Sequence, residues 1–392
     1  MTIKIAHLAD THLGYRQYGL QEREDDFYDS FINIVDDIIE RKVDYVIHSG
    51  DLFDQPKPPI KALLVAQACF NKLMDNNIEV YVIAGNHDIL QRRNTSLPQE
   101  LYENEYFHIL STKDNHFILK DDIYLTGIPY IQKTHEAKVK EMLDNLVLET
   151  KNHKHSILML HGGVTKFFEF NCEFELDTIP EGFDYYAMGH IHQRITDNFK
   201  NGIIAYPGST DIKDKGEILE YDNKGKGYTL LTIDENIETE YVDFELERKF
   251  IVKDIKYYEL DEKIEELVEE IENILLKRTK KPVLLLNIKE GNFDRSDVSS
   301  RIYDKLGELS LTIRLTYEPT EMDITIPGNQ KRLSPKVALS NRIKEELGEE
   351  FEVLGYDLYK QLSKQNIQEA QDISDTFYEE HYTVKKEKKN DN

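Results

Sequence analysis

Five short apolar runs in the first half of this chain are each followed by side chains that can bind a metal ion. The runs are rich in β-branched and aromatic residues, which predicts buried strands over residues 3–9, 43–48, 80–84, 157–160 and 185–188. The side chains that follow them are Asp10, His12, Asp51, Asn86, His161, His190 and His192. Loops at the carboxyl edge of an open sheet converge on one crevice, so we expect these side chains to meet there.

This set of side chains fits a site for two metal ions. It mixes carboxylate, amide and imidazole groups and includes no cysteine, which suits Mn²⁺ or Fe, although Zn²⁺ is also compatible. Two ions about 4 Å apart can clamp a phosphate and lower the pKa of a bridging water, giving hydroxide near neutral pH. The ligands are flanked by residues that permit sharp turns and close approach, namely Gly50, Gly85, Gly162 and Gly189. The pattern predicts a two-metal hydrolase.

Five sequence blocks resemble, in order and spacing, the motifs of the calcineurin-like metallophosphoesterases. They are Asp10-Thr11-His12, Gly50-Asp51-Leu52-Phe53-Asp54, Gly85-Asn86-His87-Asp88, His161-Gly162-Gly163 and Gly189-His190-Ile191-His192. Within that superfamily, the sequence around the first, second and last blocks resembles the archaeal Mre11 family of double-strand-break repair nucleases. This resemblance covers the whole chain and is firmest over residues 1–245. It implies a Mn²⁺-dependent nuclease of DNA ends that works with the Rad50 ATPase and forms a homodimer.

The same resemblance implies a role for each matched residue. One ion would be held by Asp10, His12, His192 and a shared Asp51, and the second by Asp51, Asn86, His161 and His190. His87 matches the family's catalytic histidine. While hydroxide attacks phosphorus in line, His87 would protonate the leaving oxygen or donate a hydrogen bond to the phosphoryl group, and Asp88 would orient it. The implied activities are 3′-to-5′ exonuclease and single-strand endonuclease.

Three further residues near the motifs have open roles. Asp54 stands where some relatives carry a histidine thought to orient the substrate phosphate, but an ionised aspartate cannot donate a hydrogen bond to phosphate. His7 and His48 lie inside predicted strands close to the site. Each would either orient a ligand or be a satisfied core histidine, and the second interpretation is favoured. Residues 207–209, Pro-Gly-Ser, would form either a turn or a loop at the rim of the site.

The charge balance argues against DNA binding. The chain has 49 Lys and Arg against 74 Asp and Glu, a net charge of −25, whereas affinity for DNA rises with the number of phosphates that basic side chains neutralise. Bound divalent cations would reverse the charge at the site, and acidic residues can crowd on remote surfaces. Candidate DNA contacts in loops after the first three motifs are Arg16, Lys57, Arg92 and Arg93, each of which is otherwise ordinary loop charge.

Length and composition set the frame around the site. The chain has 392 residues and 40% hydrophobic content, enough for two or three domains with a sizeable core. We expect no signal peptide and no membrane span, because no apolar run approaches the necessary length. Cys69 and Cys172 lie far apart without ligand-like spacing, which favours buried, reduced thiols in the cytosol over a disulfide, although the two could pair. The resemblance places the protein in the archaeal cytosol, associated with the nucleoid.

Periodicity predicts an α/β class for residues 1–245. Amphipathic helices over 22–41 and 59–76 alternate with the strands. Runs at 123–128, 203–206 and 228–233 predict a second sheet, giving a two-sheet calcineurin-like sandwich flanked by helices. The helix around Leu63 to Phe70 would either pair two copies, as the family suggests, or pack in the core.

Residues 246–320 are predicted to form a small α/β unit. Its expected elements are strands at 250–258, 283–288 and 311–317 and helices at 261–277 and 296–306. It resembles the family's capping domain, which is implied to select and rotate DNA toward the metals. A purely structural lid is the alternative.

The remaining residues are predicted to bind a partner. A linker over 321–333 precedes helices over 334–382, which begin at the N-cap Ser334 and first-turn Pro335 and carry amphipathic spacing. These helices are too few to enclose a core, and exposed apolar stripes commonly dock on a partner. The family implies the base of the Rad50 coiled coil, and packing back on the parent domain is the alternative. Residues 383–392 are expected to form a disordered tail.

Two other functions stay open at this point. A nucleotide or small-molecule phosphodiesterase would use the same site, because the metals define phosphoester hydrolysis without naming the alcohol. The chain could also be a mainly structural subunit that tethers DNA ends for an ATPase.

Overall fold

The computed structural model describes residues 2–90, 96–168, 172–318, 343–344, 348, 351–362 and 367–378. The chain divides into two compact units, Met1–Glu318 and Pro319–Asn392. The first unit contains both large sheets and a third, smaller sheet.

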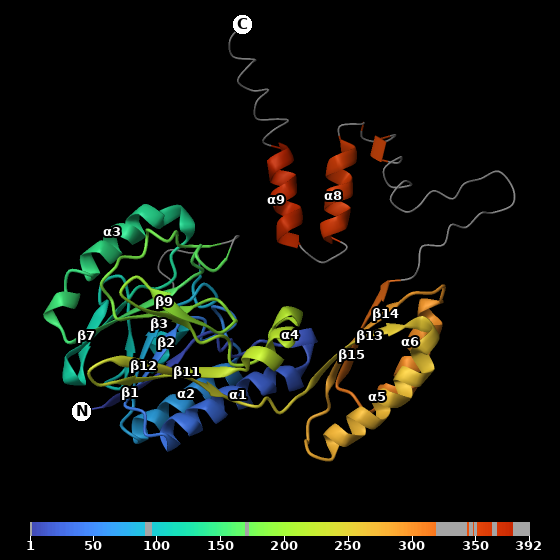
Figure 1. The fold of residues 1–392 in the computed structure, drawn as a ribbon, viewed down its shortest axis with the longest axis horizontal. Coiled ribbons are helices and arrows are strands. Elements are labelled where there is room, and N and C mark those ends of the chain that lie inside the picture. The colour runs from blue at the N-terminus through green and yellow to red at the C-terminus, as the bar shows by residue number, and fades with distance from the viewer. Residues whose placement is uncertain are drawn as a thin grey trace, which may run out of the picture. The chain divides into compact units, whose positions relative to one another are not determined.

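Two six-stranded sheets form the larger part of the first unit (Figure 1). The first sheet has the order β12-β11-β1-β2-β3-β4, with β1 (Ile3–Leu8), β2 (Tyr45–Ser49), β3 (Glu79–Ile83), β4 (Phe107–Ile109), β11 (Gly227–Ile233) and β12 (Ile237–Asp243). The second has the order β5-β6-β7-β8-β10-β9, with β5 (His116–Leu119), β6 (Ile123–Gly127), β7 (His155–His161), β8 (Tyr185–Gly189), β9 (Ile195–Phe199) and β10 (Gly202–Tyr206). The central strands of both sheets run parallel.

The core lies between the two sheets and under the helices. Alternate residues of the parallel strands point to opposite faces, so a strand buried on both faces is apolar throughout. Ile5, Ile47 and Ile83 of the first sheet pack with Ile157 and Met159 of the second in one buried cluster. The opposite faces of the two sheets pack under helices, as two further clusters show.

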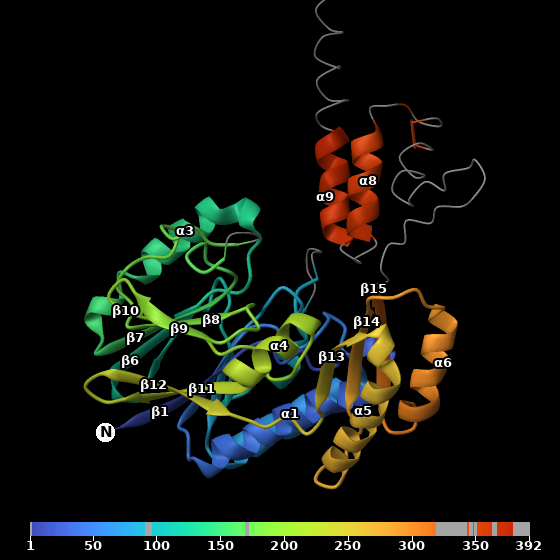
Figure 2. The same cartoon turned by 45° about the vertical axis from the view of Figure 1, so that its right-hand side comes forward.

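Four helices flank the sandwich. α1 (Gln21–Glu40) and α2 (Ile60–Asp75) lie on the side of the first sheet, and α3 (Glu136–Leu146) lies on the opposite side against the second (Figure 2). α4 (Lys215–Lys224) begins at Asp214, whose side chain accepts a hydrogen bond from the backbone N–H of Glu217. Short 3₁₀ helices span Gln17–Gly19, Pro98–Tyr102, Lys120–Asp122, Lys133–His135, Thr150–Asn152 and Tyr257–Glu259.

This architecture confirms the expected two-sheet α/β class but divides the strands differently. The run 228–233, expected in the second sheet, is β11 and pairs antiparallel with β1 in the first, with Ile5 opposite Leu231. The ligand-bearing strands β7 and β8 belong to the second sheet, whereas β1, β2 and β3 belong to the first. Apolarity reveals that a strand is buried, but it does not name the neighbouring strand.

Residues 250–318 contain all five expected elements. They are β13 (Phe250–Lys256), α5 (Leu260–Leu275), β14 (Val283–Lys289), α6 (Arg295–Leu306) and β15 (Thr312–Glu318). The three strands form a parallel sheet with β14 in the centre, and both helices pack on it through one apolar cluster. The βαβαβ order produces this arrangement, because each parallel pair needs a crossover helix.

A buried ionic cluster ties this third sheet to α1. Arg23 is fully buried and donates to Asp26 and to Asp211, 2.8 Å from Oδ1 of the latter. Asp26 also accepts hydrogen bonds from Arg248, just before β13, and from Lys280, just before β14. Burial opposes the charge of Asp26, yet Arg248, Arg23 and Lys280 together hold its pKa below the usual value.

The described part of the second unit consists mainly of two helices. α8 (Glu352–Leu362) and α9 (Ile367–Tyr378) pack against each other, and the rings of Phe351 and Phe377 lie 5.4 Å apart. The predicted linker 321–333, the predicted start at Ser334-Pro335 and the predicted tail 383–392 lie outside the described residues.

Cys69 and Cys172 are both buried and are not joined in a disulfide, as expected of reduced thiols. Within the residues that the structure describes, every helix is too short or too polar to cross a membrane.

Candidate metal centre

The seven side chains expected to bind metal lie at the carboxyl ends of strands from both large sheets. Asp10 and His12 follow β1, Asp51 follows β2, and Asn86 follows β3. His161 is the last residue of β7, while His190 and His192 follow β8. The two sheets therefore present their ligand loops to one another across the sandwich.

Four of these residues have backbone angles in the left-handed region. The φ angles are 54° at Asp10, 44° at His12, 56° at Asp51 and 90° at His190. Such conformations cost a non-glycine residue roughly 1–3 kcal/mol each and cluster at functional sites. Backbone hydrogen bonds hold the first two in place, from Asp10 N to Gly50 O at 3.0 Å and from His12 N to Asp51 O at 3.1 Å.

Asp10, His12 and His192 form one group whose ligand atoms all lie within 4.8 Å of one another. The Nε2 atoms of His12 and His192 face each other at 3.0 Å. The carboxylate of Asp10 accepts a hydrogen bond from the backbone N–H of His190 at 2.9 Å. This bond holds the carboxylate beside the loop that follows β8 and carries both His190 and His192.

Asp51, His161 and His190 form a second group of the same size. Oδ1 of Asn86 lies 3.0 Å from Nε2 of His161 and 3.1 Å from Nδ1 of His190. Oδ2 of Asp51 lies 3.4 Å from Nε2 of His161 and 3.9 Å from Nε2 of His12. One carboxylate thus faces both groups, and the structure brings all seven side chains together.

The arrangement of lone pairs fits a cation. Nδ1 of His161 donates to the carbonyl of Ser49 at 2.8 Å, so the Nε2 of a neutral ring presents a lone pair to the amide oxygen of Asn86. Two acceptors at this distance need a positive charge between them. Although burial favours the neutral ring, Asp51 and Asp10 raise the pKa of His161 to about 9. In the metal-free protein a proton takes the place that a divalent cation fits.

Burial keeps two other imidazoles neutral, as a metal ligand requires. It lowers the pKa of His12 to about 3 and that of His190 to about 3. Burial opposes ionisation of Asp51, but His161 and His12 hold its pKa well below the usual value. Neutral imidazoles beside an ionised carboxylate are a donor set that suits a divalent transition-metal ion.

His87 lies at the edge of this cluster. Its Nδ1 donates to the backbone carbonyl of Asp54 at 2.7 Å, and its backbone N–H donates to Oδ1 of Asp51 at 2.8 Å. The ring lies 4.9 Å from that of His12, and the side chain is 37% exposed. Because Nδ1 of His87 is already hydrogen-bonded, Nε2 is the ring nitrogen that remains available to contact a substrate.

Asp88 does not orient His87, contrary to the expectation from the sequence. Its buried carboxylate instead accepts the backbone N–H groups of Leu52, Phe53 and Gly85, at 3.3, 3.0 and 2.9 Å. Burial and the nearby Asp51 raise its pKa to about 7. Asp88 therefore joins the loop after β2 to the loop after β3.

The two strand histidines differ. Both ring nitrogens of His7 are bonded, to the hydroxyls of Tyr185 at 2.9 Å and Ser49 at 3.0 Å, so it is a satisfied core histidine. Nε2 of His48 contacts the hydroxyl of Thr11 at 3.1 Å. His48 therefore supports the loop that carries Asp10 and His12 through a residue that lies between them.

The candidate DNA contacts are only partly described. Arg16 is half exposed and donates to Glu24 and Gln21, while Lys57 is exposed. Arg92 and Arg93 lie outside the described residues. Ser209 of the Pro-Gly-Ser run is fully buried behind His192, which makes this run an internal turn.

Three residues at the site were not found from the sequence. Oε1 of Glu217 lies 2.8 Å from Nδ1 of His192, Lys226 donates to Oε2 of Glu217, and Lys213 Nζ lies 3.0 Å from Oδ1 of Asp54. The one available signal is Asp214, a good N-cap residue followed three positions later by a glutamate. It marks a helix start but not what Glu217 contacts.

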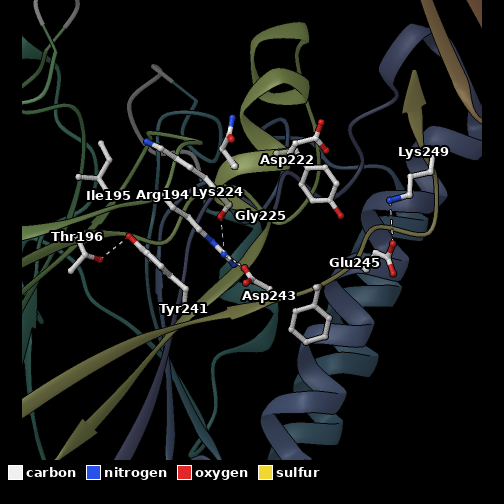
Figure 3. Close-up of a pocket in the computed structure, with 13 residues that line it drawn as sticks. Arg194, Ile195, Thr196, Asp222, Lys224, Gly225, Tyr241, Asp243, Glu245 and Lys249 are labelled. Carbon is white, nitrogen blue, oxygen red and sulfur yellow. Dashed lines mark hydrogen bonds and ion pairs between the residues drawn. The ribbon is translucent and has the colours of Figure 1, made fainter. Parts of the chain in front are cut away.

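A cavity of about 810 Å³ lies away from the cluster, beside α4 and β12 (Figure 3). Its lining includes Arg194, Tyr221, Tyr241 and Asp243, and none of the seven candidate ligands. The guanidinium of Arg194 donates to Lys224 O at 3.0 Å, to Val242 O at 2.9 Å and to Asp243. Arg194 therefore ties the end of α4 to β12.

Comparisons with known proteins agree with this geometry. Residues 3–194 match the family model of the calcineurin-like phosphoesterases. The DNA double-strand break repair protein Mre11 of Methanocaldococcus jannaschii is 42% identical over 254 residues, which cover 64% of this chain and 69% of that protein. The protein of the same name from Methanococcus maripaludis is 33% identical over 383 residues, 96% of this chain and 99% of that protein. That from Sulfolobus acidocaldarius is 35% identical and covers 76% of this chain and 77% of its own.

Gly189→Ala should disrupt the centre, because the two sheets approach most closely there. A Cβ at Gly189 would lie 2.0 Å from Ser49 O, the acceptor of His161, and 2.9 Å from Nδ1 of His161 itself. We expect a loss of unfolding free energy on the order of 3 kcal/mol, measured by urea denaturation of the metal-free protein. Gly216→Ala, whose Cβ meets only Asp214 Oδ1 at 3.1 Å, is the control. Wild-type stability of Gly189→Ala would contradict so close an approach of the two sheets.

Proposed function

The chain belongs to the Mre11 family of calcineurin-like phosphoesterases, and we propose that it is a Mn²⁺-dependent nuclease that processes the ends of broken DNA. Membership makes it a metal-dependent phosphoesterase. The observation that carries the finer proposal is the carboxylate of Asp51, which faces both groups of candidate ligands. The activities proposed are 3′-to-5′ exonuclease and single-strand endonuclease.

The proposed ligand sets follow the two groups. Asp10, His12, His192 and Asp51 would hold the first Mn²⁺, and Asp51, Asn86, His161 and His190 the second. When bound, the ions neutralise phosphate charge and lower the pKa of a water molecule. Support comes from the neutral rings of His12 and His190 and from two close approaches, of Nε2 of His12 to Nε2 of His192 and of Nε2 of His161 to Oδ1 of Asn86.

His87 is the proposed catalytic residue. With Nδ1 tied to Asp54 O, its Nε2 would donate a hydrogen bond to the phosphoryl group or protonate the departing sugar oxygen. The bond from the backbone N–H of His87 to Asp51 keeps the ring at a fixed place beside the first group. His87 is thus positioned by the same carboxylate that faces both groups.

The acidic charge of the chain does not exclude DNA from the site. α5 alone carries seven acidic residues and one lysine, so a part of the excess negative charge lies on this helix. Its apolar residues pack on the third sheet and its charges face solvent. We propose that residues 246–320 form a capping domain that guides DNA and contacts it away from this acidic face of α5. We also propose that Arg16 and Lys57 contact the phosphate backbone of the DNA.

His87→Asn and Asp51→Ala should separate catalysis from metal binding. His87→Asn should retain metal and lose about 10²- to 10⁴-fold in cleavage rate, because only the proton donor is removed. Asp51→Ala should lose both, because it removes the carboxylate between the groups. Bound Mn²⁺ is counted by calorimetry, and cleavage is followed on duplex DNA ends beside bis(p-nitrophenyl) phosphate and cyclic nucleotides. His87→Asn cutting DNA at the wild-type rate, or cyclic nucleotides being the best substrates, would contradict the proposal.

The C-terminal helices are the proposed binding site for an ATPase of the Rad50 type. On α8 and α9 the large apolar side chains Val353, Tyr359 and Tyr378 are 71%, 49% and 61% exposed. Exposed apolar side chains on a pair of helices support docking on a partner. We further propose that this work takes place in the cytosol, at the nucleoid.

A chain ending near residue 330 should keep nuclease activity and lose co-purification with the ATPase, because the metal centre and the C-terminal helices lie in separate compact units. Affinity purification of the co-expressed pair measures this, with the full chain as control. Retention of the ATPase by the shortened chain would place the binding surface elsewhere.

We also propose a homodimer formed through α2. Ile60 and Leu64 are 75% and 58% exposed one turn apart, whereas Ala62, Ala66 and Phe70 pack in the core. Leu64→Glu should therefore give a monomer by light scattering, with Lys61→Glu, on the same helix, as the control. A wild-type protein of monomer mass would overturn the proposal.

A further inference from the structure

Two carboxylates lie directly behind the imidazoles of His12 and His192, and each is paired with a lysine. Glu217 is paired with Lys226, and Asp54 with Lys213. Lys213, Glu217 and Lys226 belong to one stretch of the chain around α4, and only Asp54 lies in a sequence motif. This pattern goes beyond the ligand set of the proposed function.

The two carboxylate oxygens of Glu217 make four polar contacts. Its Oε1 lies 2.8 Å from Nδ1 of His192 and accepts the backbone N–H of Lys213 at 3.3 Å. Its Oε2 accepts the hydroxyl of Ser209 at 2.7 Å and the ammonium of Lys226. Lys226 also donates to the backbone carbonyl of His192 at 3.1 Å. Both members are about 95% buried, so each charge depends on the other.

Asp54 and Lys213 do not repeat this arrangement at His12. Nζ of Lys213 donates to Nδ1 of His12 at 3.1 Å, whereas Oδ1 of Asp54 lies 3.5 Å from that nitrogen and 3.0 Å from Nζ of Lys213. The ammonium of Lys213 also lies 5.0 Å from the centre of the Tyr15 ring, which helps to hold it. Asp54 is 20% exposed, which makes this pair the looser of the two.

Glu217 decides where the ring proton of His192 lies. Its carboxylate accepts a hydrogen bond from Nδ1–H, which leaves the lone pair on Nε2 of the neutral ring. At His12 the ammonium of Lys213 donates to Nδ1, so the proton of the neutral ring lies on Nε2 and points at Nε2 of His192, 3.0 Å away. In the metal-free protein that proton occupies the place that a cation would take beside His192.

We propose that Glu217 with Lys226 is a positioning pair that fixes the tautomer of His192 for the first metal ion. The inference rests on the proposed two-ion function. Lys226 keeps Glu217 ionised inside the protein, and Glu217 orients the imidazole of His192.

The second group is oriented by other means, which provides an internal comparison. His161 is fixed by the backbone carbonyl of Ser49 at 2.8 Å. Nε2 of His190 lies 3.7 Å from Glu173, whose carboxylate accepts the backbone N–H of Gly163 at 2.8 Å. Loss of Glu217 should therefore weaken the binding of the first ion and leave the binding of the second unchanged.

The first experiment counts ions in the full chain by Mn²⁺ titration calorimetry, with Glu217→Gln as the test variant. In Glu217→Gln the amide oxygen turns to Lys226 and the amide N–H₂ to His192, so Nδ1 must become the acceptor. Affinity for one ion should fall about 10- to 100-fold, and that for the other should not change. Glu220→Gln, on the same helix and bonded to Gln193, is the matched control.

The second experiment reads the tautomers without metal. Nitrogen-15 chemical shifts of the ring atoms in the metal-free protein should show Nδ1–H at His192 in the wild type and Nε2–H in Glu217→Gln. A merely structural role for Glu217 would not move this signal. The thermal unfolding curve of each variant shows whether it is folded, and the double variant Glu217→Gln with Lys226→Met removes both charges if the single change unfolds the chain.

The outcomes separate the two proposals. Selective weakening of the binding of one ion, together with the switched tautomer, supports the positioning pair. Two ions bound as tightly as in the wild type, or an unchanged tautomer at His192, overturns it and leaves the proposed nuclease intact. A wild-type protein that binds fewer than two ions contradicts the two-ion function, while the tautomer still tests Glu217.

Discussion

The close approach of two sheets at their carboxyl edges is the constraint on which the centre depends. A Cβ at Gly50, next to β2 of the first sheet, would lie 2.4 Å from Nδ1 of His161, and one at Gly189 of the second sheet would lie 2.0 Å from Ser49 O. This close approach lets the backbone carbonyl of Ser49, in one sheet, accept a hydrogen bond from Nδ1 of His161, in the other. Ligands that lie far apart in the sequence, from Asp10 to His192, are thereby gathered at one place.

Pairing of opposite charges stabilises the buried ionic groups around the centre. A buried ionic group is unfavourable unless it has a partner of opposite charge, and the structure supplies such partners in three places. Asp51 is surrounded by imidazoles, Glu217 is matched by Lys226, and Arg23 is matched by Asp26 and Asp211. The last of these clusters also includes Arg248, so the third sheet is joined to the sandwich by ions as well as by apolar contacts.

The sequence predicted the features that depend on local pattern. Asp51 and Asn86 could be found because each follows an apolar run and a glycine, and the helix-crossover order of residues 250–318 was visible in its periodicity. The sequence could not assign β11 to the correct sheet, because the apolar pattern of a strand does not specify that it pairs with β1. Glu217 was missed for the same reason, because its contact with His192 exists only after α4 has packed. Asp88 was misassigned because adjacency in sequence to His87 does not place two side chains together.

The bonds from Asp88 to three backbone N–H groups have a thermodynamic consequence for loading. Loops that are already ordered lose little conformational entropy when cations arrive, so nearly all of the intrinsic coordination energy appears as affinity. We therefore expect the apo and metal-loaded forms to share one backbone. Chelation would then remove the ions without unfolding the site, unlike small zinc modules, which unfold when stripped of their ion.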